Sequence, residues 1–184
     1  MSTVTDPLTE RLIAELYKVE GKAEIVDGRI VQMSPTGLNP GRAGGAIFLS
    51  LRAFEKTVGG VAVPDNVGFL TDLPNLKSFC PDAAFHTGPR TGMKFLSQAP
   101  DFAAEVRSEG DHGLGAEREM AKKRADYFAA GTKVVWDVDL ESDEVVRVYR
   151  AGSPESPTKY HRGEMAEAEP AVPGWTMSVD ELFE

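Results

Sequence analysis

The chain has 184 residues, of which 41% are hydrophobic and 27% are charged, values that are ordinary for a soluble globular domain. Its formal net charge is −9. This charge argues against a protein that coats nucleic acid generally, because such binding depends on neutralising phosphates with Lys and Arg. A local basic patch, or an acidic site filled by a divalent cation, stays compatible with it.

No apolar run approaches the roughly 20 residues that a membrane-spanning helix needs. The stretch "MSTVTDPLTE" lacks a basic region followed by an apolar segment, so we expect no signal peptide. The single cysteine, Cys80, excludes an intramolecular disulfide, and three scattered histidines predict no zinc cluster. We therefore expect one cytoplasmic domain that spans residues 1–184.

The N-terminal part of the chain predicts a helix followed by a β-hairpin. The helix is expected over about residues 7–17, with Thr5 or Asp6 as its N-cap. In "AEIVDGRIVQM", two short apolar runs flank Asp27-Gly28, a pair that suits a type I′ turn. These residues therefore form the clearest hairpin signal in the sequence.

A second helix is expected from about residue 40 to residue 57, after a loop rich in turn residues. Asn39 can cap this helix and Pro40 can open it. The pair Gly44-Gly45 inside it predicts close packing against a neighbouring element. The next segments, "GVAVPDNVGFL" and "SFCPDAAFH", each predict a strand.

The second half predicts four further strands and the most regular helix of the sequence. "PDFAAEVRS" reads as a buried strand, and "GAEREMAKKRADYFAAG" as a helix that Gly131 stops. "KVVWDVD" and "EVVRVYR" follow as strands, with a short strand at residues 158–161. The order predicts a mixed α/β or α+β domain built on a central sheet.

Glu105 stands at the centre of the apolar strand "PDFAAEVRS" and needs a partner. Three Pro-Asp pairs offer Asp65, Asp82 and Asp101 as candidates. Asp101 lies on the same strand about 13 Å away, too far to share one ion, and is read as the polar start of the strand. Asp82 lies on a separate apolar strand. If that strand neighbours the Glu105 strand, side chains directly opposite each other have Cβ atoms about 5 Å apart.

An Asp82/Glu105 pair could therefore hold a hard divalent cation, and without a cation one of the two pKa values would be raised. The alternative is that Asp82 caps a turn, while Glu105 faces solvent or pairs with Arg107.

Helical phasing places Lys123 beside the apolar arc of the following helix and Lys122 on its polar side. Lys123 could thus reach a pocket at the sheet, or extend along the edge of a buried face.

The segments "AEIVDGRIVQMSPTG", "GFL", "PDAAF", "APDFAAEVRSEGD", "KKRADYFAAGTKVVWDVD" and "PGWTMSVDELF" together resemble the Uma-two family of restriction-endonuclease-like proteins. The resemblance covers about residues 15–184. It implies the PD-(D/E)xK nuclease fold, a mixed sheet flanked by helices, with an Mg²⁺- or Mn²⁺-dependent phosphodiesterase site that acts on DNA. Nucleases of this fold often dimerise, so a homodimer is expected.

The resemblance also implies site residues. Asp82 and Glu105 match the acidic pair of the motif, with the Val106 carbonyl as a third metal ligand. Arg107 stands where the standard motif has its lysine, and Lys123 matches a variant that takes the lysine from the next helix. Glu24 would complete the acidic cluster by holding a metal-bound water or a second ion.

Two departures from the family pattern concern loops beside this site. Relatives usually have His-Gly where this chain has Pro40-Gly41, and Ser-Pro-Ser-Asp where this chain has residues 108–111.

The expected function is metal-dependent DNA cleavage. The alternatives are a catalytically inactive nuclease-fold module that binds nucleic acid or a protein partner, and a hydrolase of another phosphate ester or of a sugar.

Overall fold

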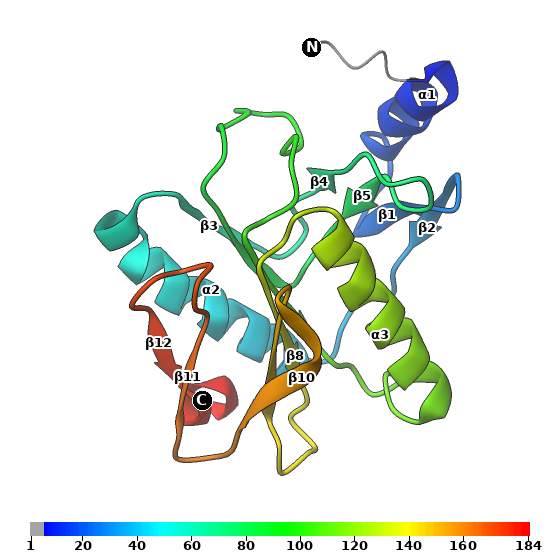
Figure 1. Ribbon diagram of the computed structural model, residues 1–184. Coiled ribbons are helices and arrows are strands. Elements are labelled where there is room, and N and C mark those ends of the chain that lie inside the picture. Colours follow the sequence, from blue (N-terminus) through cyan, green and yellow to red (C-terminus); the bar gives the residue numbers. More distant parts are fainter. Residues whose placement is uncertain (1–5) are drawn as a thin grey trace.

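A six-stranded sheet forms the centre of the computed structural model, which describes residues 6–184 (Figure 1). Its strands run in the order β10 (Ser153–Tyr160), β9 (Val146–Arg150), β8 (Val134–Val138), β7 (Phe102–Val106), β6 (Ala83–His86) and β3 (Val61–Pro64). Among the strand pairs of this sheet within the described residues, only β7 and β8 are parallel, and α3 (Leu114–Ala129) connects them. The predicted mixed α/β class is therefore confirmed.

Figure 1 shows α2 (Leu38–Val58) on one side of this sheet and α3 on the other. The C-terminal segment packs beside α2. It consists of β11 (Met165–Glu167), β12 (Thr176–Ser178) and the 3-10 helix η1 (Val179–Phe183). The remaining elements precede β6 in the chain: α1 (Pro7–Leu16), β1 (Ala23–Val26), β2 (Arg29–Gln32), β4 (Phe69–Leu70) and β5 (Ser78–Phe79).

Strand β7 lies at the centre of two hydrophobic clusters. Phe102, Ala104 and Val106 pack towards α2, together with Trp136 of β8. Ala103 packs on the α3 side. Because both faces of the strand are covered, its sequence is apolar except at Glu105, and this charged residue must find internal partners.

The predicted helices are present, with one error in capping. Asp6 caps α1 by accepting a hydrogen bond from the Thr9 N–H at 3.3 Å, whereas Thr5 lies outside the described residues. Helix α2 begins at Leu38 after Gly37, so the predicted cap at Asn39 is wrong. Pro40 still fits because the N–H groups of a first helical turn need no intrahelical partner.

The expected turn at Asp27-Gly28 is confirmed, since both residues have positive φ, 48° and 71°. The single strand expected over residues 60–70 is instead split into β3 and β4, which lie in different sheets. Asn66 turns the chain between them with φ 62°. Residues 78–86 are split in the same way into β5 and β6.

Gly44 of α2 lies directly against Asp82, the residue that precedes β6. A Cβ atom at this position would lie 3.4 Å from the Cβ of Asp82 and 3.5 Å from its carbonyl oxygen. A Cβ at Gly45 would meet nothing within 4 Å. The predicted close packing is therefore confirmed for Gly44 and wrong for Gly45. At Gly44, this packing brings α2 against the backbone of Asp82.

Candidate active site

A cleft of about 1590 Å³ contains the carboxylates that the sequence singled out. Glu24, Asp82, Glu105 and Lys123 all line it. They come from β1, from the residue before β6, from β7 and from α3 respectively. Four elements that are distant in the chain thus meet at one end of the central sheet.

Asp82 lies beside Glu105 because of the register of β6 and β7. Ala83 pairs with Ala104, and the Asp82 N–H donates to the Ala104 carbonyl at 3.1 Å. One carboxylate oxygen of Asp82, Oδ2, accepts the N–H of Val106 at 2.8 Å. Asp82 is therefore held across the strand pair, and the alternative that it only caps a turn is wrong.

Glu105 is buried, with 8% of its surface exposed, and both of its oxygens have partners. The Tyr127 hydroxyl donates to Oε1 at 2.6 Å, and the Lys123 ammonium donates to Oε2 at 3.0 Å. Glu105 thus neither faces solvent nor pairs with Arg107. Burial raises its pKa to about 7, with Asp82 acting in the same direction and Lys123 opposing.

Lys123 links two of the carboxylates. Its Nζ lies 3.0 Å from Glu105 Oε2 and 3.3 Å from Glu24 Oε1, and Glu24 also accepts the Cys80 N–H at 2.8 Å. Burial lowers the pKa of Lys123, but the neighbouring carboxylates raise it further, so the net pKa lies above its ordinary value. Lys122 lies at the rim of the cleft, where its Nζ is 3.8 Å from Asp27, on the polar side of the helix that the phasing predicts.

Lys22 is a site residue that the sequence reading missed. Its Nζ lies 2.6 Å from Asp82 Oδ1 and 2.8 Å from Asp65 Oδ1. The available signal was its position two residues before Glu24, which puts both side chains on one face of an extended chain. Asp65 belongs to another of the three Pro-Asp pairs, and its partner could not be read from local sequence.

The third Pro-Asp pair lies outside the cleft. Asp101 Oδ2 accepts from the Thr87 N–H at 2.8 Å and from the Thr87 hydroxyl at 2.7 Å. Its Oδ1 accepts from Lys133 at 2.7 Å. Asp101 therefore fastens the start of β7 to its neighbours, in agreement with its reading as a polar strand start.

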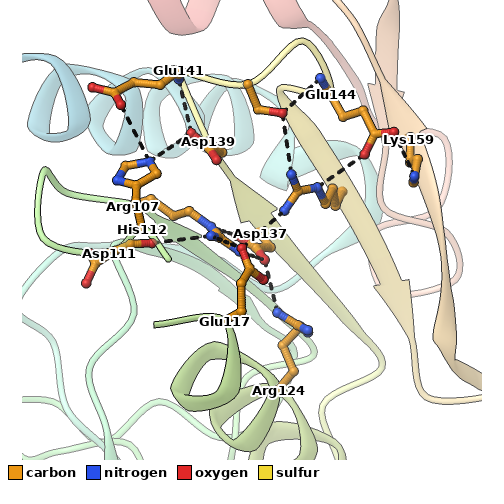
Figure 2. A network of polar contacts seen from close by, with 12 residues as sticks. Arg107, Asp111, His112, Glu117, Arg124, Asp137, Asp139, Glu141, Glu144 and Lys159 are labelled. Atoms are coloured by element: carbon orange, nitrogen blue, oxygen red, sulfur yellow. Dashed lines mark hydrogen bonds and ion pairs between the residues drawn. The ribbon is translucent and has the colours of Figure 1, made fainter. Parts of the chain in front are cut away.

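The Arg107 side chain extends away from the cleft centre and forms part of a buried ionic network, which Figure 2 shows. Its Nε and one terminal nitrogen bind the two oxygens of Asp137 at 2.7 and 2.8 Å, and it also pairs with Glu117 of α3. Arg124 of α3 binds the same Asp137 at 3.0 Å, so two arginines share this buried carboxylate. All three guanidinium nitrogens of Arg107 therefore donate to protein carboxylates, and one of them also donates to the Asp111 carbonyl at 3.3 Å.

The donor set suits a hard divalent cation. Mg²⁺ is usually held by one or two carboxylates together with water and substrate oxygens. Within residues 6–184, no group of three carboxylate, imidazole or thiol side chains converges closely enough to form a protein-only metal cage. Asp82 and Glu105 provide the two-carboxylate arrangement, and two lysine ammonium groups already act there as cations.

None of the helices within residues 6–184 has the length and apolarity that crossing a bilayer requires. This finding agrees with the absence of a long apolar run in the sequence.

Comparison with known proteins identifies the family. No curated protein matches the chain. A crystal structure described as "a putative nuclease belonging to DUF820" from Anabaena variabilis ATCC 29413 matches with a TM-score of 0.71 at 16% identity, over 94% of this chain and 97% of that one. At this identity the likeness shows a shared fold. The sequence model of the Uma2 family, described as "Putative restriction endonuclease", matches residues 12–180, and the chain therefore belongs to the Uma2 family.

Proposed function

We propose that the chain is a metal-dependent DNA endonuclease that hydrolyses phosphodiester bonds. The observation that carries this proposal is the junction of Asp82, Glu105 and Lys123 in one cleft, two carboxylates and a lysine from three separate elements. Membership of the Uma2 family and the nuclease-like fold support the same reaction class. Fold alone does not set function, so the site carries the argument.

Asp82, Glu105 and the main-chain carbonyl of Val106 would hold Mg²⁺ or Mn²⁺. The ion would polarise the phosphoryl oxygen and lower the pKa of a bound water. Glu105 must be ionised to act as a ligand, and its pKa of about 7 leaves both protonation states populated near neutral pH. Tyr127 and Lys123 orient this carboxylate towards the cleft.

Lys123 would stabilise the negative charge that develops on phosphorus and orient the attacking water. Its raised pKa favours the ammonium form, which supports electrostatic stabilisation rather than proton abstraction by this side chain. Glu24 holds the Lys123 ammonium from the other side at 3.3 Å and would bind a metal-bound water or a second ion. Arg107 would take no direct part, because Asp137 and Glu117 already occupy its guanidinium.

Cleavage of supercoiled plasmid with Mg²⁺ and Mn²⁺ tests the proposal. Asp82→Asn and Lys123→Met should each lower nicking at least 100-fold, since each removes a group that the proposed reaction requires. The chain offers matched controls for both. Asp101→Asn changes the aspartate of another Pro-Asp pair, and Lys122→Met changes the adjacent lysine on the same helix; both should keep cleavage.

Equal nicking by wild type, Asp82→Asn and Lys123→Met would reject catalysis at this site. Equal loss of activity in control variants that are folded would also reject it, because the loss would then not be specific to Asp82 and Lys123. Far-UV circular dichroism shows whether each variant is folded.

The second candidate is a catalytically inactive nuclease-fold module that binds nucleic acid or a protein partner. The observation in its favour is that twelve acidic but only five basic residues line the cleft. Calorimetric titration discriminates between the two. Binding of millimolar Mg²⁺ or Mn²⁺ that Asp82→Asn abolishes favours the enzyme, whereas no cation binding and stoichiometric binding of a partner favours the module.

A homodimer remains part of the proposal, because hydrolysis of both strands of a duplex is simplest with two copies of one site. Sedimentation velocity over a concentration series, with and without duplex DNA, measures the oligomeric state. A protein that stays monomeric in both conditions would restrict the proposal to nicking.

A further inference from the structure

Lys22 places its ammonium group in the cleft, against the carboxylate of Asp82. It precedes β1, and its carbonyl accepts the Met33 N–H at 2.9 Å, so the hairpin fixes its backbone. Its side chain is only 17% exposed. The ammonium bridges Asp82 and Asp65 at 2.6 and 2.8 Å, distances typical of charge-assisted hydrogen bonds.

This contact occupies the carboxylate that the proposed metal site needs. Asp82 Oδ2 is taken by the Val106 N–H, so Oδ1, which binds Lys22, is the oxygen without a main-chain partner. A divalent cation bound about 2.1 Å from that oxygen would lie within a few ångströms of the ammonium. Two positive charges so close repel strongly in a partly buried site.

Asp65 supplies a second partner for the ammonium on the outer side of the cleft. Its side chain is 50% exposed, compared with 20% for Asp82, and it follows β3 rather than β6. The Lys22 side chain can therefore release Asp82 and keep an ion pair with Asp65. Lys123 differs, because both of its carboxylate partners, Glu24 and Glu105, are buried.

We propose that Lys22 is the resting counter-ion of Asp82, and that a divalent cation binds Asp82 only by displacing the Lys22 ammonium towards Asp65. This inference rests on the proposed metal-dependent function. It makes Lys22 a residue that sets the metal affinity of the site and keeps the acidic pair neutralised between reactions.

Titration with Mn²⁺, followed by electron paramagnetic resonance of the free ion, tests this displacement directly and without DNA. Lys22→Met should raise Mn²⁺ affinity at least tenfold, because it removes the competing charge. Lys22→Gln should also raise it while keeping a polar side chain. Asp65→Asn should lower it several-fold, because the ammonium then has only Asp82 as a partner.

Lys122→Met is the matched control, since it removes the same charge from the rim of the same cleft, where Lys122 is paired with Asp27. Its Mn²⁺ affinity should stay within about twofold of wild type. Equal or weaker Mn²⁺ binding by both Lys22 variants, with circular dichroism like that of wild type, overturns the inference, and so does an equal gain in Lys122→Met.

The plasmid assay separates this inference from the proposed function. Cleavage by wild type together with unchanged Mn²⁺ affinity in the Lys22 variants rejects the displacement of Lys22 but supports the proposed endonuclease function. Tighter Mn²⁺ binding in the Lys22 variants, lost again in the double variant with Asp82→Asn, but with no cleavage by any protein, supports the displacement and rejects the endonuclease. No Mn²⁺ binding by any variant rejects both.

Discussion

At the scale of single residues, the two aspartates Asp82 and Asp101 show how the same local motif can serve different purposes. Both follow a proline and lie at the start of neighbouring antiparallel strands. Asp82 contacts a lysine and a main-chain N–H inside the cleft, whereas Asp101 contacts Thr87 and Lys133 outside it. Their surroundings, rather than the Pro-Asp sequence, separate a candidate ligand from a structural anchor.

Asp101→Asn should lower the free energy of unfolding by about 1 kcal/mol at pH 7, because charge-assisted hydrogen bonds to Thr87 and Lys133 are lost. Burial raises the pKa of Asp101, but these bonds lower it further, so the folded pKa lies below the ordinary 3.8. A depressed pKa stabilises the fold above about pH 4, and this contribution is lost as the pH falls through the folded value.

Urea unfolding of wild type and Asp101→Asn at pH 7, 5 and 3.5 measures this effect. The difference between the two proteins should be constant from pH 7 to pH 5 and should shrink at pH 3.5. A difference that is the same at all three values would show that Asp101 does not act through its charge.

Cys80 gives a second prediction at this scale. Its thiol is buried, and burial raises its pKa to about 12, so very little thiolate exists at neutral pH. Iodoacetamide should therefore label the native protein at pH 8 at least 100-fold more slowly than the protein in 8 M urea, as mass spectrometry can measure. Rapid native labelling would show that the segment around Glu24 and Cys80 opens readily.

At the scale of elements, Arg107 joins three parts of the fold. It follows β7 and binds Asp137 of β8 and Glu117 of α3, while its N–H donates to the Val138 carbonyl at 2.9 Å. The parallel pair and its crossover helix are thus fastened at the end of the sheet where Glu105 lies. This network, shown in Figure 2, holds the helix that carries Lys123.

Arg107→Met should lower the free energy of unfolding by about 3 kcal/mol, because it leaves the fully buried Asp137 without its bidentate partner. Urea unfolding at pH 7 measures the change. Arg11→Met is the control, since Arg11 forms an exposed pair with Glu15 that should contribute less than 1 kcal/mol. Equal losses in the two variants would contradict the role of Arg107 as a buried clamp.

The same geometry predicts the outcome of restoring the standard motif. Arg107→Lys puts lysine two residues after Glu105, but Asp137 and Glu117 would still draw the side chain away from the cleft centre. The variant should therefore fail to restore plasmid nicking when it is combined with Lys123→Met. Recovery of more than a tenth of wild-type activity in that double variant would show that position 107 can supply the catalytic cation.

At the scale of the whole molecule, the sequence predicted what depends on local pattern. The buried strand β7 and the direction of Lys123 follow from periodicities of two and 3.6 residues. The pairing of Asp82 with Glu105 was expected only if their strands were neighbours, and the family resemblance implied it. The Lys22–Asp82 and Arg107–Asp137 pairs join residues 60 and 30 positions apart, and no local pattern encodes them. The short strands β11 and β12 were missed for the same reason, since a three-residue strand leaves little periodicity to read.

The balance of charge around the cleft leads to the last prediction, which concerns DNA binding. Five basic residues line the cleft, and Lys22, Lys123 and Arg107 are already paired with carboxylates. The cleft by itself can therefore neutralise few phosphates. Lys123→Met, which should not cleave, ought to bind duplex DNA at least tenfold more tightly in Mn²⁺ than in EDTA.

Fluorescence anisotropy between 50 and 200 mM salt measures this binding. In EDTA, the slope of the logarithm of affinity against the logarithm of salt concentration should be shallower than about −3, because few Lys and Arg contacts release counterions. A steep slope with equal affinity in Mn²⁺ and EDTA would place the DNA on a basic surface outside the cleft. In that case the acidic pair would no longer be needed to hold the substrate, and only its role in the chemical step would remain.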